Sequence, residues 1–554
     1  MSNSSRNPAW LGVVVMLVLA LLSLAYIATV QFGPLRKQPL EIDEVYFSAC
    51  AARGLATQQI PVAGCHDNKG PVIYILHQWV QMTSAIYDFS AIKLAAFAVS
   101  LLLAIAAGWV AFRLSGWVAA LAAIGLLLQV FALNAALLAL KTEAVGGLFL
   151  LLGLALLIQR QGSQRYVSVS AANLFLAGAL MGLAMLTRQT YALGAVLAVA
   201  WLCLTTPDQH WAARLRAALK NGVIFSLGVL TPVLLFLLMF YLGGRHLEYL
   251  ATTFVYPAVR FLPRDVPMLK AIIWEINTVL LRLSEAPLLT GLFAIEIAAA
   301  LSLTSYSNAV QPRLNKYRVL LLLMALGMLV VIFMSPVFFN SHIIPIQMLM
   351  SVVGGVVLAE LGTRMSAAMP AASPYLTAGL VTSAVLMANT SWSRSGENLA
   401  AEQNPLANVE SVGGTNNESR GQFAYVLGMA PAFYAANGLI PASNLMFPWA
   451  IEGMPNSAMY HQPPPETRKG RMLAWAHQQN QGKLWADFAR TPPRYILVVQ
   501  PMARGPNSKR ISDVPGFDEY IHEHCRYVRD SALTPRWPTS LYSCAADQPK
   551  VPGN

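Results

Sequence analysis

Two adjacent carboxylates and a lysine lie close together in a chain that otherwise avoids charge. Asp43 and Glu44 follow the first long apolar run, and Lys69 begins the turn that leads into the apolar segment 72–76. A carboxylate within reach of a hydroxyl can act as a general base, typically worth about 10²- to 10⁴-fold in rate. A cation can stabilise the negative charge that develops on a departing group. The segment 41–74 is therefore predicted to be the reaction centre, with Asp43 as the base and Lys69 beside the leaving group.

Each of these residues also has a structural interpretation. Acids are favoured at the N-terminus of any helix, so Asp43 and Glu44 could simply begin a solvated one. A lysine at a membrane surface commonly extends its side chain towards lipid headgroups, which would account for Lys69.

The composition is that of a membrane protein. Of the 554 residues, 56% are hydrophobic and 12% are charged, whereas an average soluble protein has roughly 25% charged residues. Apolar runs long enough to cross the roughly 30 Å hydrocarbon core recur along the chain, and backbone groups in lipid require helices. The sequence predicts an α-helical polytopic protein with about eleven transmembrane helices. They begin near Trp10, Ala91, Val118, Ala144, Leu174, Tyr191, Val223, Pro287, Val319, Ile343 and Tyr375.

Lys and Arg in the short connections predict the orientation, because such charges are retained in the cytoplasm. The basic connections fall on one face of the predicted bundle and contain Arg6, Arg113, Arg160, Arg165, Arg214, Arg216, Lys220, Arg313, Lys316, Arg318 and Arg364. The N-terminus is then inside, whereas the loops 33–90 and 244–286 and the C-terminus are outside. The net charge of +12 is mostly this topology signal. It does not indicate a nucleic-acid partner, because the basic residues are dispersed and form no stripe with aromatic side chains.

The outer connections supply further candidates. Glu143 begins the fourth predicted span, where a charge needs a partner or a function; a surface pair with Lys141 is the structural alternative. Arg188 separates two short apolar runs, Arg260 belongs to a basic outer loop, and His342 precedes the tenth span. Excess positive charge in an outer loop indicates either an anionic ligand or contact with lipid headgroups.

Two domains are expected. Residues 1–390 would form the transmembrane catalytic domain, including both outer loops. The composition then turns soluble, so residues 391–554 are predicted to form a small extracytoplasmic α/β domain. Within it, 495–499 is typical of a buried strand, and helices are expected over 470–489 and 517–528.

Four of the five cysteines form two candidate pairs in regions predicted to lie in the oxidising compartment. They are Cys50 with Cys65 and Cys525 with Cys544, whereas Cys203 lies within a span. Either pair could be a disulfide or two buried thiols, and the sequence does not settle the connectivity.

No resident cofactor is predicted. The run 522–525, with two histidines, a glutamate and a cysteine, has the composition of a metal site, but its spacing matches no zinc pattern. An exposed helix end explains it more simply. A divalent cation beside the carboxylates is compatible with the sequence, because oxygen-only ligation leaves no spacing signature.

Taken in order, these motifs resemble the GT-C glycosyltransferases of the dolichyl-phosphate-mannose-protein mannosyltransferase type, the glycosyltransferase family 39/83-like group that includes the bacterial aminoarabinose transferase acting on lipid A. The resemblance covers nearly the whole chain. Its motifs are Asp43-Glu44, Lys69-Gly70-Pro71, Thr142-Glu143, Gly182-Leu183-Ala184-Met185-Leu186-Thr187-Arg188 and Pro492-Pro493-Arg494-Tyr495-Ile496-Leu497-Val498-Val499. The chain departs from the family before the tenth span, where members often carry an Arg and a Tyr and this chain has Asn340-Ser341-His342.

The resemblance implies an inverting enzyme of the bacterial inner membrane that transfers a sugar from a polyprenyl-phosphate donor to an extracytoplasmic acceptor. The acceptor would be lipid A, a glycan, a glycolipid or a protein. An apolar groove between spans would hold the polyprenyl tail, and membrane lipid would be a further partner. Asp43, Glu44 and Glu143 would be the catalytic residues. The residues expected to contact the donor phosphate are Lys69, Arg188, Arg260 and His342.

A membrane transporter or flippase for a lipid-linked or anionic solute is the alternative. Transporters usually place ionisable groups near the bilayer midplane and often have related halves. In this chain the candidate charges gather at one edge of the predicted bundle, only Glu296 and Glu360 interrupt the spans, and no internal repeat is seen.

Overall fold

The computed structural model describes residues 42–59, 69–133, 139–158, 169–205, 211–250, 262–263, scattered positions between 273 and 284, 286–301, 312–334, 343–368, 420–446 without 429, 460–461, 464, 466–499, 514–534 and 537–544. The chain divides into two compact units. The first comprises the described parts of Ala96–Val233 and Ala271–Glu402, and the second comprises those of Pro39–Ala95, Leu234–Lys270 and Gln403–Asn554. Composition predicts the outer loops as part of the transmembrane domain, whereas most of their length belongs to the same compact unit as the C-terminal residues.

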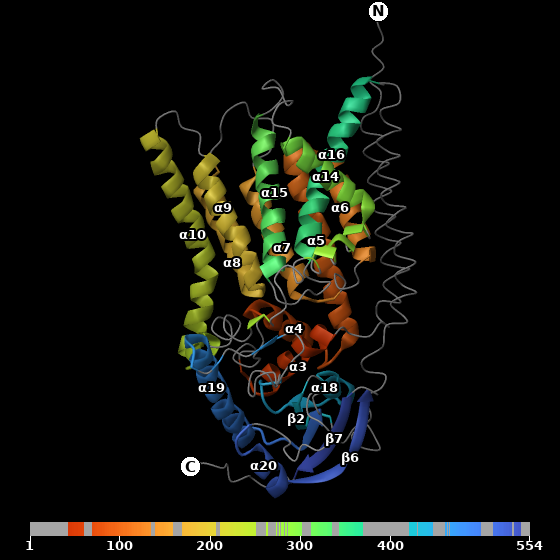
Figure 1. Ribbon diagram of the computed structural model, residues 1–554, viewed down its shortest axis with the longest axis vertical. Coiled ribbons are helices and arrows are strands. Elements are labelled where there is room, and N and C mark those ends of the chain that lie inside the picture. Colours follow the sequence, from red (N-terminus) through yellow and green to blue (C-terminus); the bar gives the residue numbers. More distant parts are fainter. Residues whose placement is uncertain are drawn as a thin grey trace, which may run out of the picture. The chain divides into compact units, whose positions relative to one another are not determined.

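The first unit is a bundle of apolar helices, with the greater parts of α5 and α10 included in it (Figure 1). Its described elements are α5 (Phe89–Ser115), α6 (Trp117–Leu133), α7 (Thr142–Leu157), α8 (Ala171–Thr187), the 3₁₀ turn η4 (Gln189–Tyr191), α9 (Ala192–Thr205), α10 (Trp211–Leu242), α14 (Pro287–Leu301), α15 (Pro312–Met334) and α16 (Ile344–Ala368).

Three of these helices are long and apolar enough to cross a membrane, namely those over Phe89–Ser115, Trp211–Leu242 and Ile344–Arg364. Six shorter apolar helices accompany them in the described part of the chain. The predicted spans that begin near Trp10 and Tyr375 lie outside the described residues. The protein is thus a multi-pass membrane protein.

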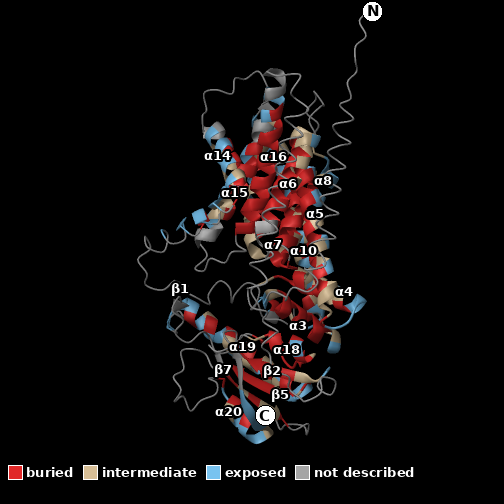
Figure 2. Cartoon of the chain, turned by 90° about the vertical axis from the view of Figure 1, so that its right-hand side faces the viewer, coloured by how far each residue is buried: buried red, intermediate tan, exposed pale blue. Residues whose placement is uncertain are grey.

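Small residues let the helices of the bundle approach closely. Helices α6 and α16 form its buried centre (Figure 2), where a Cβ added at Gly355 would lie 2.6 Å from the carbonyl oxygen of Ala119. On α8 and α10, a Cβ at Gly178 or Gly228 would overlap a backbone carbonyl oxygen of the facing helix. Helix association in lipid relies on such close backbone packing, because lipid tails are as apolar as the side chains.

The second unit combines helices with a mixed sheet. Its helices are α3 (Ile42–Ala56), α4 (Pro71–Thr83), α11 (His246–Leu250), α18 (Ala432–Asn437), α19 (Arg468–Arg490) and α20 (Phe517–His524). Its strands are β1 (Leu262–Pro263), β2 (Phe423–Leu427), β3 (Ile440–Pro441), β4 (Tyr460–His461), β5 (Tyr495–Val499), β6 (Cys525–Thr534) and β7 (Trp537–Cys544). Helices α3 and α4 pack together, and α3 also contacts α18 and β3.

The strands form a five-stranded sheet in the order β3-β2-β5-β7-β6, and β1 pairs separately with β4. Strand β2 is parallel to β3 and β5, whereas β7 is antiparallel to β5 and β6. Strand β5 occupies the predicted positions 495–499, and its last four residues are buried. The apolar face of α19 buries Leu473, Leu484 and Phe488.

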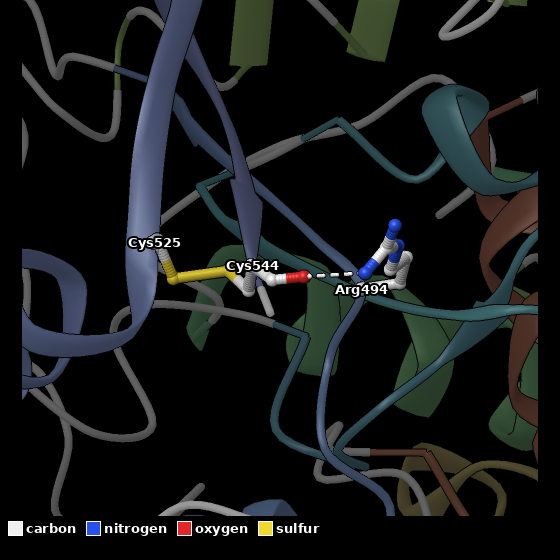
Figure 3. Close-up of a disulfide and its surroundings, with 3 residues drawn as sticks. All are labelled: Arg494, Cys525 and Cys544. Carbon is white, nitrogen blue, oxygen red and sulfur yellow. Dashed lines mark hydrogen bonds between the residues drawn. A yellow bond between two sulfur atoms is a disulfide. The ribbon is translucent and has the colours of Figure 1, made fainter. Parts of the chain in front are cut away.

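The helix predicted over 517–528 is wrong in its last four residues, 525–528. Helix α20 ends at His524, and Cys525 begins β6, where it pairs with Cys544 of β7. A disulfide joins these two cysteines, and Arg494 donates a 3.0 Å hydrogen bond to the carbonyl oxygen of Cys544 (Figure 3). Pairing across the hairpin therefore overrides the local helical pattern.

The remaining cysteines differ in their bonding. Cys50 is also disulfide-bonded, and Cys65, its expected partner, lies outside the described residues. Cys203 on α9 is a free thiol.

Candidate functional site

The N-terminus of α3 carries the two acids that the sequence singles out. Asp43 and Glu44 are the second and third residues of the helix, where the partial positive charge of the helix end stabilises carboxylates. Successive side chains on a helix diverge by about 100°, so the two acids have different surroundings. Asp43 is partly exposed, whereas Glu44 is fully buried.

Glu44 forms a buried ion pair with Lys93. The distance between the Lys93 Nζ and Glu44 Oε2 atoms is 2.6 Å, and the side chains are 6% and 0% exposed. Lys93 lies near the start of α5 and was not among the predicted site residues. A lone lysine in a long apolar run was the available signal, because such a charge needs a partner.

Helix α4 packs its polar groups against α3. The Ser48 hydroxyl donates to the Glu44 carbonyl oxygen at 2.6 Å and lies 3.1 Å from His77 Nδ1, while Gln81 donates to the Ser48 carbonyl oxygen at 2.8 Å. Because a hydroxyl has one hydrogen, a neutral His77 with its proton on Nδ1 satisfies both Ser48 contacts. Ser48 is thus a structural hydroxyl and its arrangement is not that of an activated nucleophile.

Lys69 lies two residues before the start of α4. Gly70 is the N-cap residue with an extended backbone, and Pro71 is the first helical residue. A proline is favoured there because the N–H that it lacks would have no helical acceptor. The turn therefore places the half-buried Lys69 at the leading end of α4.

The first unit holds a second cluster, centred on Glu143. The Arg188 guanidinium pairs with Glu143 Oε1, and the Thr142 hydroxyl donates to Oε2 at 2.9 Å. The hydroxyl of Tyr191, a fully buried residue, donates to the Glu143 carbonyl oxygen at 2.7 Å. Gly146 makes room for the Tyr191 ring, because an added Cβ would overlap it. The cluster joins the start of α7 to the turn between α8 and α9.

This geometry rules out a surface pair between Lys141 and Glu143. Both residues are only 3% exposed, and Glu143 is held by an arginine 45 positions further along the chain. Tyr191 belongs to this cluster but is not among the predicted site residues. The available signal in the sequence was its position three residues after Arg188, in the same turn.

Two predicted phosphate contacts, Arg260 and His342, lie outside the described residues. Among the described residues, no group of three or more His, Cys, Asp or Glu side chains could hold a metal ion.

The charges that interrupt the spans form an ion cluster of their own. Arg318 on α15 pairs with Glu360 on α16, and its Nε lies 3.6 Å from Glu296 Oε1 on α14. Three helices of the bundle are thereby joined by one arginine. The cluster explains how two glutamates are accommodated among apolar helices, because opposite charges reduce the cost of burial.

Comparison with known proteins bears on the fold. No family model matches the sequence, and no curated protein sequence matches it. The solved structure of ArnT, an aminoarabinose transferase from Cupriavidus metallidurans, matches in the apo state with 14% identity, 96% coverage of this chain, 97% coverage of that chain and a TM-score of 0.57. The protein therefore has the GT-C fold of ArnT.

Two further solved structures are similar. ArnT from the same organism bound to undecaprenyl phosphate matches with 15% identity, 96% and 98% coverage and a TM-score of 0.56. The apo oligosaccharyltransferase of Archaeoglobus fulgidus matches with 11% identity, 89% coverage of this chain, 70% of that chain and a TM-score of 0.47. The GT-C resemblance predicted from the sequence motifs is thus confirmed at the level of the fold.

Proposed function

We propose that the protein is an inverting membrane glycosyltransferase that moves a sugar from a polyprenyl-phosphate donor to an acceptor hydroxyl on the extracytoplasmic side of the bacterial inner membrane. The observation that carries the proposal is the ArnT fold along almost the whole chain, because a solved structure with this fold has undecaprenyl phosphate bound. The acceptor is a lipid, a glycan or a protein that presents a hydroxyl.

Asp43 is proposed as the general base. Of the three acids predicted as catalytic, Glu44 and Glu143 are buried and face Lys93 and Arg188, respectively. A buried carboxylate that already faces a cation is not open to an incoming acceptor hydroxyl. Asp43 is the more exposed of the three, which suits a group that must reach an incoming hydroxyl.

The proposed reaction is a single displacement. Asp43 takes the proton of the acceptor hydroxyl while that oxygen attacks the anomeric carbon. The bond from this carbon to the phosphate oxygen breaks, and its electron pair stays on the lipid phosphate. Attack opposite the departing phosphate inverts the anomeric centre. The proton then passes from Asp43 to water.

Cations would stabilise the phosphate as its charge increases, which lowers the transition state more than the bound donor. Lys69 and Arg188 are the proposed contacts among the described residues, and Arg260 and His342 are proposed from the sequence. Glu143 would hold Arg188 in place, and Glu44 would hold Lys93. A divalent cation beside the carboxylates is compatible with this scheme, and activity after chelation with EDTA tests for one.

The proposal is tested with the purified protein, a radiolabelled undecaprenyl-phosphate sugar and an envelope extract as acceptor. Label should move from the lipid fraction to the acceptor. Arg188→Gln should reduce transfer about 100-fold or more, by loss of a phosphate contact, whereas replacement of the exposed Arg471 by Gln should leave it unchanged. Uptake of the labelled lipid or an anionic solute into sealed vesicles with no glycosyl product would contradict the proposal and support the transporter alternative.

A further inference from the structure

The last turn of α3 carries a buried arginine that reaches into the C-terminal part of the second unit. Arg53 is 1% exposed, and its guanidinium donates to the Pro441 carbonyl oxygen at 2.7 Å and to the Thr491 hydroxyl at 3.2 Å. It also forms an ion pair of 3.1 Å with Asp487 on α19. Burial lowers the pKa of Arg53, and the attraction of Asp487 opposes that shift. One side chain thus contacts β3, α19 and the turn after α19.

Asp487 and Thr491, which contact Arg53, form further hydrogen bonds of their own. Asp487 accepts hydrogen bonds from the Ser443 hydroxyl at 2.8 Å and from the Asn444 backbone N–H at 3.4 Å. The Thr491 hydroxyl donates to the Ala442 carbonyl oxygen at 2.8 Å and contacts the Asp487 carbonyl oxygen at 2.9 Å. The groups that hold Arg53 are therefore themselves held by residues of the C-terminal part of the unit.

Stability alone does not account for an ion pair at this place. A buried pair can often be replaced by apolar side chains at no cost, although the loss of one partner alone is harmful. What the guanidinium adds, through two hydrogen bonds from Nη1 and an ion pair from Nη2, is a restricted orientation, because each hydrogen bond requires its own direction. A second contact also joins this region to the C-terminal part of the unit: the Tyr87 hydroxyl donates to the Leu439 carbonyl oxygen at 2.8 Å.

Helix α3 is held at both ends. Near its start, Glu44 pairs with Lys93, and near its end, Arg53 pairs with Asp487. Asp43 and Arg53 are ten residues apart, so about 15 Å of continuous helix separates them. A helix transmits a tilt at one end to the other, and displacement of a catalytic group by about 1 Å can cost on the order of 100-fold in rate.

We propose that Arg53 is a positioning residue through which the C-terminal domain sets the orientation of α3 and hence of Asp43. The inference rests on the proposed function, in which Asp43 is the base. It assigns to residues 420–544 a role in the reaction itself, although they supply none of the proposed catalytic groups.

The test uses the full-length double variant Arg53→Met/Asp487→Asn. This variant leaves no unpaired buried charge at the pair, and the amide oxygen introduced at position 487 can still accept from Ser443, so the protein is expected to fold. The expected kcat for sugar transfer falls about 10- to 100-fold, with KM for the donor within about twofold of the native value. Arg53→Lys retains the charge but cannot make the contacts with Pro441, Thr491 and Asp487 at the same time. Its kcat should lie between that of the native protein and that of the double variant. Lys483→Met is the matched control, because Lys483 also lies near Asp487, at 3.9 Å, but belongs to the same helix as this acid.

Hydrogen exchange provides a readout that does not depend on activity. Amides of α3 should exchange faster in the double variant, while those of β2 and β5 keep their native protection. A native kcat in both the double variant and Arg53→Lys, or unchanged exchange in α3, would overturn the inference. If the native protein transfers no sugar but α3 still exchanges faster in the double variant, the proposed function fails and the anchoring of α3 stands.

Discussion

Replacement of Lys93 by Met should strongly destabilise the second unit, because it removes the cation that lies against the buried Glu44 carboxylate. The Lys93 Nζ atom lies 2.6 Å from Glu44 Oε2, and the two side chains are 6% and 0% exposed. At an effective dielectric constant near 20, two charges at this distance attract by about 6 kcal/mol, most of which offsets the loss of hydration. Removal of one partner from a buried pair costs about 3–5 kcal/mol.

The assay is denaturant unfolding in detergent, followed by tryptophan fluorescence. The unfolding equilibrium of Lys93→Met should shift by on the order of 10²- to 10⁴-fold. The double variant Glu44→Gln/Lys93→Met removes both charges and should recover most of the lost stability. Lys469 is exposed on α19, so Lys469→Met serves as the control and should change the free energy by less than about 0.5 kcal/mol. A Lys93→Met protein as stable as this control would refute the reasoning.

Three further predictions concern other parts of the chain. Gly178→Ala should lower the thermal midpoint of the protein in detergent, because its Cβ would overlap a carbonyl oxygen of α10, whereas Gly291→Ala, with nothing within 4 Å, should not. The Cys525→Ala/Cys544→Ala variant should lose about 3 kcal/mol of unfolding free energy, as expected for closure of a loop of 19 residues; unchanged urea unfolding would contradict this. Burial raises the pKa of Tyr520 to about 12, so its contribution to stability is present below about pH 10 and is lost as the pH rises through 12. Difference absorbance near 295 nm checks this titration, and a Tyr520→Phe control should lack it.

The sequence predicted correctly those helices and strands whose residues show a clear local pattern of apolar spacing. The strand 495–499 and the helix over 470–489 are found almost at their predicted bounds, because burial alternation and apolar spacing are properties of a single segment. The helix over 517–528 was wrong in its last four residues, because the strand that begins at Cys525 depends on pairing with β7.

The candidate site shows the same limit. Glu143 and Arg188 could each be singled out as charges at the ends of apolar runs, but their pairing spans 45 positions and appears only in the folded chain. Lys93 gives only a weak signal in the sequence, because a single lysine hardly alters the apolar character of its span. Arg53 resembles an ordinary basic residue in the last turn of a helix, and only the folded second unit reveals its acceptors.

The grouping of the outer loops was also beyond the sequence. Composition separates apolar from polar segments along the chain, so it joins residues 33–90 to the spans that flank them. In the structure, α3 and α4 belong to the same compact unit as the C-terminal sheet, and contacts such as that of Arg53 with Asp487 create this unit. Such contacts between distant segments leave no periodic signal.

The central claim is that Asp43 accepts the proton of the acceptor hydroxyl. The most direct test compares the rate of transfer from a radiolabelled undecaprenyl-phosphate sugar by the native protein and by Asp43→Asn, with Glu519→Gln on the exposed side of α20 as the control. Asparagine keeps the size of the side chain and removes its basicity, so kcat should fall by about 10²- to 10⁴-fold while hydrogen exchange in α3 stays native. Equal transfer by the native protein and Asp43→Asn would contradict the account.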